Sequence, residues 1–185
     1  MNKLKIYRLA VLIAFVPAFL ELGGCASPAN RASMSLPSFT TSKQLNKTIS
    51  VMVFGGSDTG AMESTNISDE EFKAAIEDAI SKSKLFKEIT QDSNSDFDLQ
   101  VNISSLSKPS FGFTFEVQME AGWVLSKRSD KSIVMKKAIK SIGRATAGDT
   151  LIAVNRIQMA VERAAQNNIS QGLGAISDLN DKSLK

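Results

Sequence analysis

Strand-like patterns recur along this chain. The β-branched, apolar run 48–54 predicts a buried strand, and 85–89 predicts a short second strand. Apolar and polar residues alternate over 97–103, as expected for a strand with one buried face. A longer alternation covers 111–125, and after a charged turn the chain returns over 132–142, where the alternation slips as at a β-bulge. The pattern predicts a sheet of about five strands.

The longest alternation places a row of large apolar residues along one strand face. These residues are Phe111, Phe113, Phe115, Val117, Met119, Ala121, Trp123 and Leu125. A strand of this length spans about 50 Å at 3.3 Å per residue, so we expect it to bend near Gly122 or to overhang the sheet. The row favours a core face beneath helices, and the alternative is a groove that binds lipid.

Two segments have the spacing of amphipathic helices. Ser68-Asp69-Glu70-Glu71 is a capping box, in which the serine accepts from the amide three residues on and the last glutamate reaches back. Apolar residues then recur at helical spacing to about residue 84. The segment 149–179 has a long helical period that includes Leu151, but Gly172 and Gly174 predict a kink or two separate helices.

These elements predict an α+β fold. We expect a two-layer sandwich in which a mixed or antiparallel sheet carries two helices on one face. A single domain is predicted to span 48–179, followed by a frayed C-terminus at 180–185. The chain is long enough for this domain to bury one hydrophobic core.

Residues 1–24 have the order of a bacterial secretory signal. Lys3, Lys5 and Arg8 precede an apolar run over 9–20, which is shorter than the roughly 20 residues needed to span a bilayer. Small residues follow, as at a signal cleavage position. Segment 1–24 is therefore predicted to be a signal peptide that is removed.

The motif Leu22-Gly23-Gly24-Cys25 resembles the lipobox of bacterial lipoproteins. Gly23 and Gly24 leave room for signal peptidase, and Cys25 supplies the sulfur for a diacylglyceryl thioether and, after cleavage, an amine for a third acyl chain. Such chains anchor a protein firmly, because each buried CH₂ contributes about 0.8 kcal/mol. The alternative is an ordinary signal peptide with a chance cysteine.

The residue after the cysteine bears on location. It is Ala26, whereas an Asp at this position commonly retains lipoproteins of enteric-type bacteria in the inner membrane. We therefore expect a lipid-anchored protein on the periplasmic face of the outer membrane, with the inner membrane less favoured.

The segment 25–47 is interpreted as a lipidated cysteine and a flexible tether. It is rich in Ser, Thr, Pro, Ala and Asn. A coil of this kind would span roughly 25 Å and let the domain stand off the bilayer. Docking of Leu36, Pro37 and Phe39 onto the domain is the less favoured alternative.

The amino-acid composition limits the catalytic and metal-binding chemistry that the protein can have. The 185 residues include no histidine and one cysteine, so Ser-His-Asp or Cys-His catalysis, disulfides and the usual zinc sites are not expected. We predict no metal and no cofactor. The net charge of +3 approaches zero once the basic signal is removed, and the sequence has no basic patch that would bind nucleic acid.

One short motif suggests an enzyme. Asp58-Thr59-Gly60-Ala61 matches the aspartic-protease signature, and Ile142-Gly143-Arg144 echoes a second piece of the retroviral-type enzymes. Such an enzyme needs two carboxylates that share a proton. Two glycines precede Asp58 where that family has apolar strand residues, and a helix follows where it has strands. We favour a glycine-rich turn and a protein that is not an enzyme, with a protease as the remote alternative.

Two groups of residues together resemble a known class. The opening 49–56 (ISVMVFGG), with its capped helix and Ser83-Lys84-Leu85-Phe86, is similar to the strand–helix–strand unit of the TolB N-terminal domain and of LpoB- and YajG-type envelope lipoproteins. Trp123 is then followed on the last helix by Arg156, Ala160, Glu162, Ala164, Ala165, Asn168 and Ile169. The whole, over roughly 48–179, resembles small proteobacterial envelope lipoproteins, most of which lack an assigned function. The resemblance implies a periplasmic α/β domain and transfers no catalytic residue.

The leading hypothesis is a non-enzymatic outer-membrane lipoprotein that acts as an envelope adaptor or assembly factor. It would bind the membrane through acylated Cys25 and an envelope protein through its sheet edge or last helix. Arg156, Glu162 and Arg163 are interpreted as surface charges first and as a partner face second.

The alternative function is a periplasmic carrier or chaperone that holds a lipid or acyl chain against the aromatic strand. A buried cavity of some 300 Å³ beneath Phe113, Phe115 and Trp123 would favour the carrier. A filled core at this place would favour the adaptor.

Overall fold

The computed structural model describes residues 26–60, 63–91, 94–180 and 184. The predicted lipobox, Leu22 to Cys25, lies outside them. The described elements are, in order, α2 (Arg31–Met34), β1 (Leu45–Phe54), α3 (Asp69–Ser83), β2 (Phe86–Ile89), β3 (Phe97–Ser107), β4 (Thr114–Lys127), β5 (Ile133–Thr146) and α4 (Ala153–Ser177).

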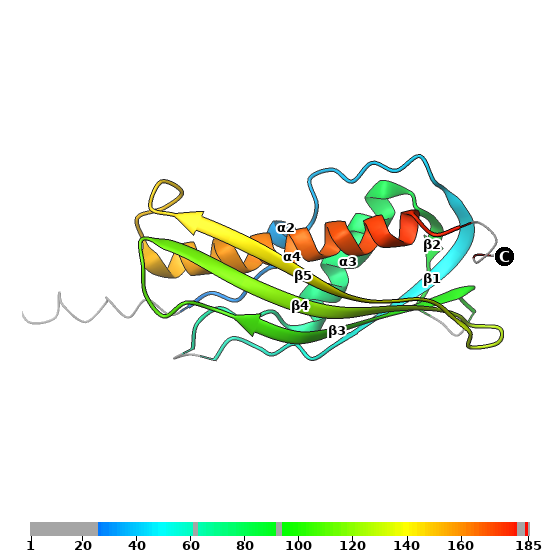
Figure 1. The fold of residues 1–185 in the computed structure, drawn as a ribbon, viewed down its shortest axis with the longest axis horizontal. Coiled ribbons are helices and arrows are strands. Elements are labelled where there is room, and N and C mark those ends of the chain that lie inside the picture. Colours follow the sequence, from blue (N-terminus) through cyan, green and yellow to red (C-terminus); the bar gives the residue numbers. More distant parts are fainter. Residues whose placement is uncertain (1–25, 61–62, 92–93, 181–183, 185) are drawn as a thin grey trace, which may run out of the picture.

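The five strands form one mixed sheet in the order β2–β1–β3–β4–β5 (Figure 1). β1 is parallel to β2 and β3, whereas β3, β4 and β5 form an antiparallel meander. A parallel neighbour needs a crossover, which α3 supplies between β1 and β2. The predicted α+β class with a five-stranded mixed sheet is confirmed, and α2 is an additional short helix.

α3 begins at the predicted capping box. Ser68 Oγ accepts from the Glu71 amide at 3.3 Å, and three acidic side chains occupy the first turn, where they suit the helix dipole. The Glu71 carboxylate, which was predicted to reach back to the start of this helix, instead accepts from the amide of Arg31. The helix ends after Ser83, because Lys84 adopts the left-handed conformation with φ of 54°.

α4 is one continuous helix of 25 residues, so the predicted division into two helices is wrong. Gly172 lies against Trp123, and a Cβ there would sit 2.5 Å from the indole ring. Gly143 in β5 allows an equally close approach, since a Cβ there would sit 2.0 Å from the Ala160 carbonyl oxygen. These glycines bring α4 close to the sheet, and the packing gained offsets the low helix propensity of Gly172.

Residues 27–36, which we term the N-terminal strap, pack against α3 and α4. Met34 in α2 is fully buried, and Ala29 and Leu36 are also buried. The following strand starts at Leu45, earlier than predicted. The flexible tether expected over 25–47 is therefore wrong for the strap, because composition alone gives no information about the helices that receive it.

The aromatic row is only partly in the core. β4 begins at Thr114, so Phe111 and Phe113 precede it and are 88% and 86% exposed. From Phe115 onward the alternate residues of β4 are buried as predicted. Leu151, predicted to belong to the apolar face of the last helix, also precedes that helix and is 85% exposed.

Candidate functional site

The strap is fixed to α4 through Glu162. Its Oε1 accepts from Asn30 Nδ2 at 2.9 Å, from the Asn30 amide at 3.3 Å and from Gln158 Nε2 at 3.0 Å. Asn30 also caps α2 by accepting from the Ser33 amide at 3.0 Å. Burial raises the pKa of Glu162, and the hydrogen bonds oppose this rise only in part. Glu162 is therefore an internal acceptor that recognises the strap.

A second set of contacts fixes the strap to α3. Arg31 Nε donates to Asp78 Oδ2 at 2.7 Å, and Ser35 Oγ donates to the same oxygen at 3.0 Å. The hydrogen bond from Arg31 holds the pKa of Asp78 below its ordinary value, with Ser35 adding to the effect against the cost of burial. The strap thus joins the two long helices, which otherwise make few contacts with each other.

Arg156 organises the end of the molecule at which α4 begins. Its Nη1 donates to the carbonyls of Thr150 and Leu151, each at 3.1 Å, and its Nη2 donates to the Gly112 carbonyl at 3.5 Å. The guanidinium lies 5.3 Å from the centroid of the Phe115 ring, in cation–π geometry. One buried cation therefore joins the loop before β4 to the loop before α4.

Arg163 lies on a different side of α4 and contacts the sheet edge. Its Nη2 pairs with Asp149 Oδ1 at 2.7 Å, and its Nη1 donates to the Arg144 carbonyl at 2.6 Å. Asn167 donates to the Ile142 carbonyl at 2.7 Å. Because β5 is an edge strand, these α4 side chains cover the second half of that edge.

The structure does not gather the three predicted partner residues into one exposed face. Arg156 and Glu162 are each only 7% exposed, so their interpretation as surface charges is wrong. Only Arg163 is substantially accessible, with 40% of its side chain exposed. The polar face of an amphipathic helix is buried here because the strap and two loops cover it.

The first half of the β5 edge is different in character. Ile133 is 60% exposed, and Lys136, Lys137 and Ala138 are exposed beside it. An edge strand presents unpaired backbone groups that can pair with a strand of another protein, and lysines are common on such edges. This half of the β5 edge is an accessible stretch of sheet edge, the kind of surface that the sequence analysis expects to bind a partner.

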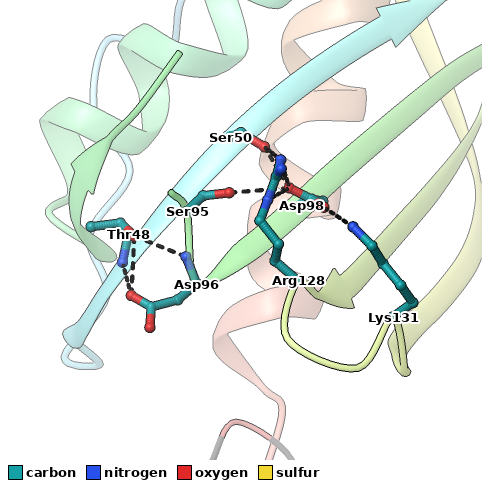
Figure 2. Close-up of polar contacts among 7 residues, drawn as sticks. All are labelled: Thr48, Ser50, Ser95, Asp96, Asp98, Arg128 and Lys131. Carbon is teal, nitrogen blue, oxygen red and sulfur yellow. Dashed lines mark hydrogen bonds and ion pairs between the residues drawn. The ribbon is translucent and has the colours of Figure 1, made fainter. Parts of the chain in front are cut away.

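A polar cluster lies at the opposite end of the sheet from Arg156, where β1 and β3 begin beside the β4–β5 turn (Figure 2). Asp98 Oδ1 accepts from Ser50 Oγ at 2.7 Å, from Ser95 Oγ at 3.1 Å and from Arg128 Nε at 2.9 Å. Lys131 Nζ lies 3.5 Å from the other carboxylate oxygen. We call these five residues the polar cluster.

The polar cluster has the chemistry of a group that stabilises the fold. Burial alone would raise the pKa of Asp98, but the hydrogen bonds from Ser50, Arg128 and Ser95 outweigh it and leave the pKa below its ordinary value. A general base at neutral pH needs a pKa near 7 and access to a substrate proton. Asp98 is only 5% exposed and ionised well below pH 7, so the cluster does not fit acid–base catalysis.

The core around Trp123 is filled. Trp123 is fully buried, and its Nε1 donates to Asn168 Oδ1 at 2.8 Å. Asn168 in turn donates to the Ile139 carbonyl at 3.0 Å, and Gly172 leaves no space against the indole ring. Phe113 points away from this core, as its exposure shows. The described packing therefore favours the adaptor over a carrier that uses this strand.

Another concave surface lies at the β2 edge. This groove of about 750 Å³ opens between β2 and the C-terminal end of α3, and its lining includes Lys84, Phe86 and Glu88. The groove mixes charged and apolar side chains. It lies at the β2 edge, and β1 and β3 separate it from the aromatic part of β4. It therefore does not replace the cavity that the carrier hypothesis required.

The two pieces of the protease signature do not meet. Asp58 is exposed in the loop after β1, and Ile142, Gly143 and Arg144 lie within β5. β3 and β4 separate β1 from β5 in the sheet. This placement does not assemble the pair of carboxylates that an aspartic protease needs.

Membrane-spanning helices and metal-holding side-chain clusters are both absent from the described part of the chain. No helix there is both long and apolar enough to cross a bilayer. No group of three or more His, Cys, Asp or Glu side chains in the same residues is arranged to hold a metal ion.

No protein-family model and no curated protein matches this sequence. Among solved structures, the fold is similar to a DUF330 protein from Xanthomonas campestris, with 12% identity, 82% of this chain and 98% of that chain covered, and a TM-score of 0.59. A hypothetical protein from Chlamydia trachomatis matches with 6% identity, 73% and 98% coverage, and a TM-score of 0.54.

A minor lipoprotein from Acinetobacter baumannii matches with 7% identity, 72% and 94% coverage, and a TM-score of 0.43. At these identities the likenesses show the fold alone. The finer resemblance to TolB, LpoB and YajG proteins stays an expectation from sequence.

Sequence reasoning missed the polar cluster and the strap contacts. Ser50 and Asp98 are the usable signal for the cluster, because they are short polar residues within strands whose neighbours are apolar. Asn30 could have been recognised as a helix N-cap, although a helix of four residues has no periodicity to support it.

Proposed function

We propose that this protein is a lipid-anchored envelope lipoprotein that binds a protein partner without catalysing a reaction. The lipobox Leu22-Gly23-Gly24-Cys25, which follows a complete secretory signal, is the observation that carries this proposal. The acylated protein would face the periplasm from the outer membrane, as Ala26 favours. The resemblance to TolB-, LpoB- and YajG-type domains supports an envelope role.

A binding role suits the chemistry of the described residues. The carboxylates of Asp98 and Asp78 are occupied by internal hydrogen bonds, and that of Glu162 holds the strap. Groups that are already saturated in this way stabilise a fold and are poor candidates for proton transfer.

The surface we propose for the partner is the first half of the β5 edge, 133–138. A partner strand could add to this edge through backbone hydrogen bonds. Lys136 and Lys137 would favour a strand that carries acidic side chains. The second half of the edge is less suited, because Arg163 and Asn167 already use its carbonyls.

The anchor is tested by Cys25→Ser. We expect the variant to lose its acyl groups by mass spectrometry and to leave the outer-membrane fraction or accumulate as precursor. A Cys25→Ser protein that still carries acyl groups and fractionates like the parent would refute the anchor.

The partner is tested by photocrosslinking in cells. A photoreactive residue at Lys136 is expected to capture one recurrent protein, while the same residue at Gln100, exposed on a central strand, is expected not to capture it. Equal capture at both positions would argue against the edge. Lipid adducts without a protein would favour the carrier function.

A further inference from the structure

Four large apolar side chains are exposed at the end of the domain where α4 begins. Phe111, Phe113, Leu151 and Ile152 are 88%, 86%, 85% and 60% exposed, and we call them the apolar tip. Single exposed apolar residues are ordinary on protein surfaces, but a group that gathers on neighbouring loops indicates a binding surface.

The apolar tip is held in a defined arrangement. Thr114, which directly follows Phe113, pairs with Thr146 at the end of β5. Arg156 donates to the Gly112 carbonyl between the two phenylalanines and to the Leu151 carbonyl. The same cation therefore joins the two loops that present the four side chains.

The strap runs toward this tip. Asn30 contacts Glu162, and Pro28 accepts from Gln158 Nε2 at 3.2 Å, so the chain traced backwards moves one turn along α4 toward its first residues. Ser27 and Ala29 are held on the other side by Thr65 and Asn66. The described chain begins at the end of the molecule where α4 starts (Figure 1).

This course limits the distance between the lipid and the domain. Cys25 precedes the bonded Ser27 by two residues, which even fully extended span only about 7 Å. The stand-off of about 25 Å expected for a free tether is therefore not available. Interfacial apolar segments enter a bilayer by about 5–10 Å, which is the same scale.

We propose that the apolar tip inserts into the membrane that carries the acyl chains of Cys25, so that the domain docks on the bilayer in a fixed orientation. The inference rests on the proposed acylation of Cys25. Charges near the tip do not oppose it, because Asp149 pairs with Arg163 and Glu116 pairs with Arg144. In this orientation the β4–β5 turn points away from the membrane and β5 leads from that turn toward it.

The first experiment measures how deeply the apolar tip enters the membrane, in the mature protein acylated at Cys25. Phe113→Cys is labelled with an environment-sensitive fluorophore, since an acylated Cys25 offers no thiol and the sequence has no other cysteine. The protein is placed in vesicles of phosphatidylethanolamine and phosphatidylglycerol with or without a nitroxide-labelled lipid. Ile133→Cys is the matched control, because Ile133 is also apolar and 60% exposed but lies at the opposite end of β5.

We expect the label at 113 to shift to the blue and to be quenched severalfold more than the label at 133. Equal quenching at both positions, in protein shown by mass spectrometry to be acylated, would overturn the inference and leave the anchor intact. A blue shift at 113 that needs no vesicles and grows with protein concentration would also overturn it, because a second copy would then cover the tip.

The second experiment does not depend on acylation. The chain from residue 25 with Cys25→Ser is sedimented with the same vesicles, alone and with Phe111→Ser and Phe113→Ser. Loss of two inserted phenyl rings should weaken vesicle binding by at least about tenfold. An Ile133→Ser control should change vesicle binding little. Unchanged vesicle binding of the double variant would overturn the proposal that the apolar tip inserts into the bilayer. If Cys25 is never acylated, the proposed function fails, whereas this second experiment still decides whether the apolar tip binds a bilayer.

Discussion

The two ends of the sheet are both closed by an ionic side chain, but they present different side chains to solvent. At one end the polar cluster closes the gap between β1, β3 and the β4–β5 turn with a buried carboxylate that accepts several hydrogen bonds (Figure 2). At the other end Arg156 closes the gap between two loops, but the side chains those loops present are apolar and exposed. Each end is thus held together by a largely buried ionic side chain, Asp98 at one end and Arg156 at the other.

The comparison separates the residues that stabilise the fold from the residues that are available for binding. The polar cluster turns its carboxylate inward, where Ser50, Ser95 and Arg128 already donate hydrogen bonds to it. The apolar tip turns Arg156 inward and Phe111 and Phe113 outward. Residues that hold either end together should therefore affect folding, and residues that point outward at the tip should affect binding alone.

The largest effect on stability is expected at the polar cluster. Asp98→Ala removes the acceptor for Ser50, Ser95 and Arg128 and leaves a half-buried cation without its partner. We expect the free energy of unfolding, measured with urea, to fall by about 2–4 kcal/mol. Asp130→Ala in the neighbouring turn is the control and should change stability little.

The Asp98 effect should also depend on pH. A carboxyl whose pKa is lowered by folding contributes stability above its unfolded pKa, near 3.9, and loses it as pH falls through the folded pKa. The difference between the parent and Asp98→Ala should therefore shrink below about pH 4. A constant difference from pH 7 to pH 2 would contradict the ionic role of Asp98.

The next largest effect is expected at Arg156. Arg156→Met keeps the aliphatic stem but removes the bonds to Thr150, Leu151 and Gly112 and the contact with Phe115. We expect a loss of about 1–3 kcal/mol in urea unfolding, with faster proteolysis of the two tip loops. Arg163→Met should leave those loops protected, and equal cleavage in both variants would show that Arg156 does not join them.

Glu162→Gln should have a smaller effect, of opposite sign to Asp98→Ala at pH 7. A carboxyl whose pKa is raised by folding stabilises the fold below its unfolded pKa, near 4.3, and that contribution is lost as pH rises through the folded pKa. Glutamine keeps an acceptor for Asn30 without the buried charge, so stability at pH 7 should rise by up to about 1 kcal/mol.

Unfolding followed by fluorescence of Trp123 from pH 4 to 8 measures this effect. The parent should lose stability across the interval relative to Glu162→Gln. Parallel curves for the two proteins would mean that folding does not raise the pKa of Glu162.

The smallest effect on stability is expected at the apolar tip. Phe111→Ser with Phe113→Ser removes side chains that contact mainly solvent, so the free energy of unfolding should stay within about 0.5 kcal/mol of the parent. Phe115→Ser, in contrast, truncates a buried ring beneath Arg156 and should be clearly destabilising in the same assay. If the double variant unfolds as easily as Phe115→Ser, the tip belongs to the core.

The sequence by itself determined the local elements. The capping box at Ser68 predicts the start of α3, and the alternation of apolar residues predicts the buried face of β3 and of β4 from Phe115 onward. These features depend on near neighbours in the chain, so their physical causes can be read without the fold. The lipobox at Cys25 is likewise a local signal, and it stays a prediction.

Only the tertiary structure decided which residues predicted to be exposed are in fact buried, and which apolar residues predicted to be buried are exposed. Arg156 and Glu162 occur on the polar side of a helical pattern, yet they are buried because loops and the strap, distant in sequence, fold over them. Phe111 continues the spacing of a strand, yet it is exposed because pairing with β5 starts only at Thr114. Periodicity reports the face of an isolated element, whereas burial depends on what packs against that face.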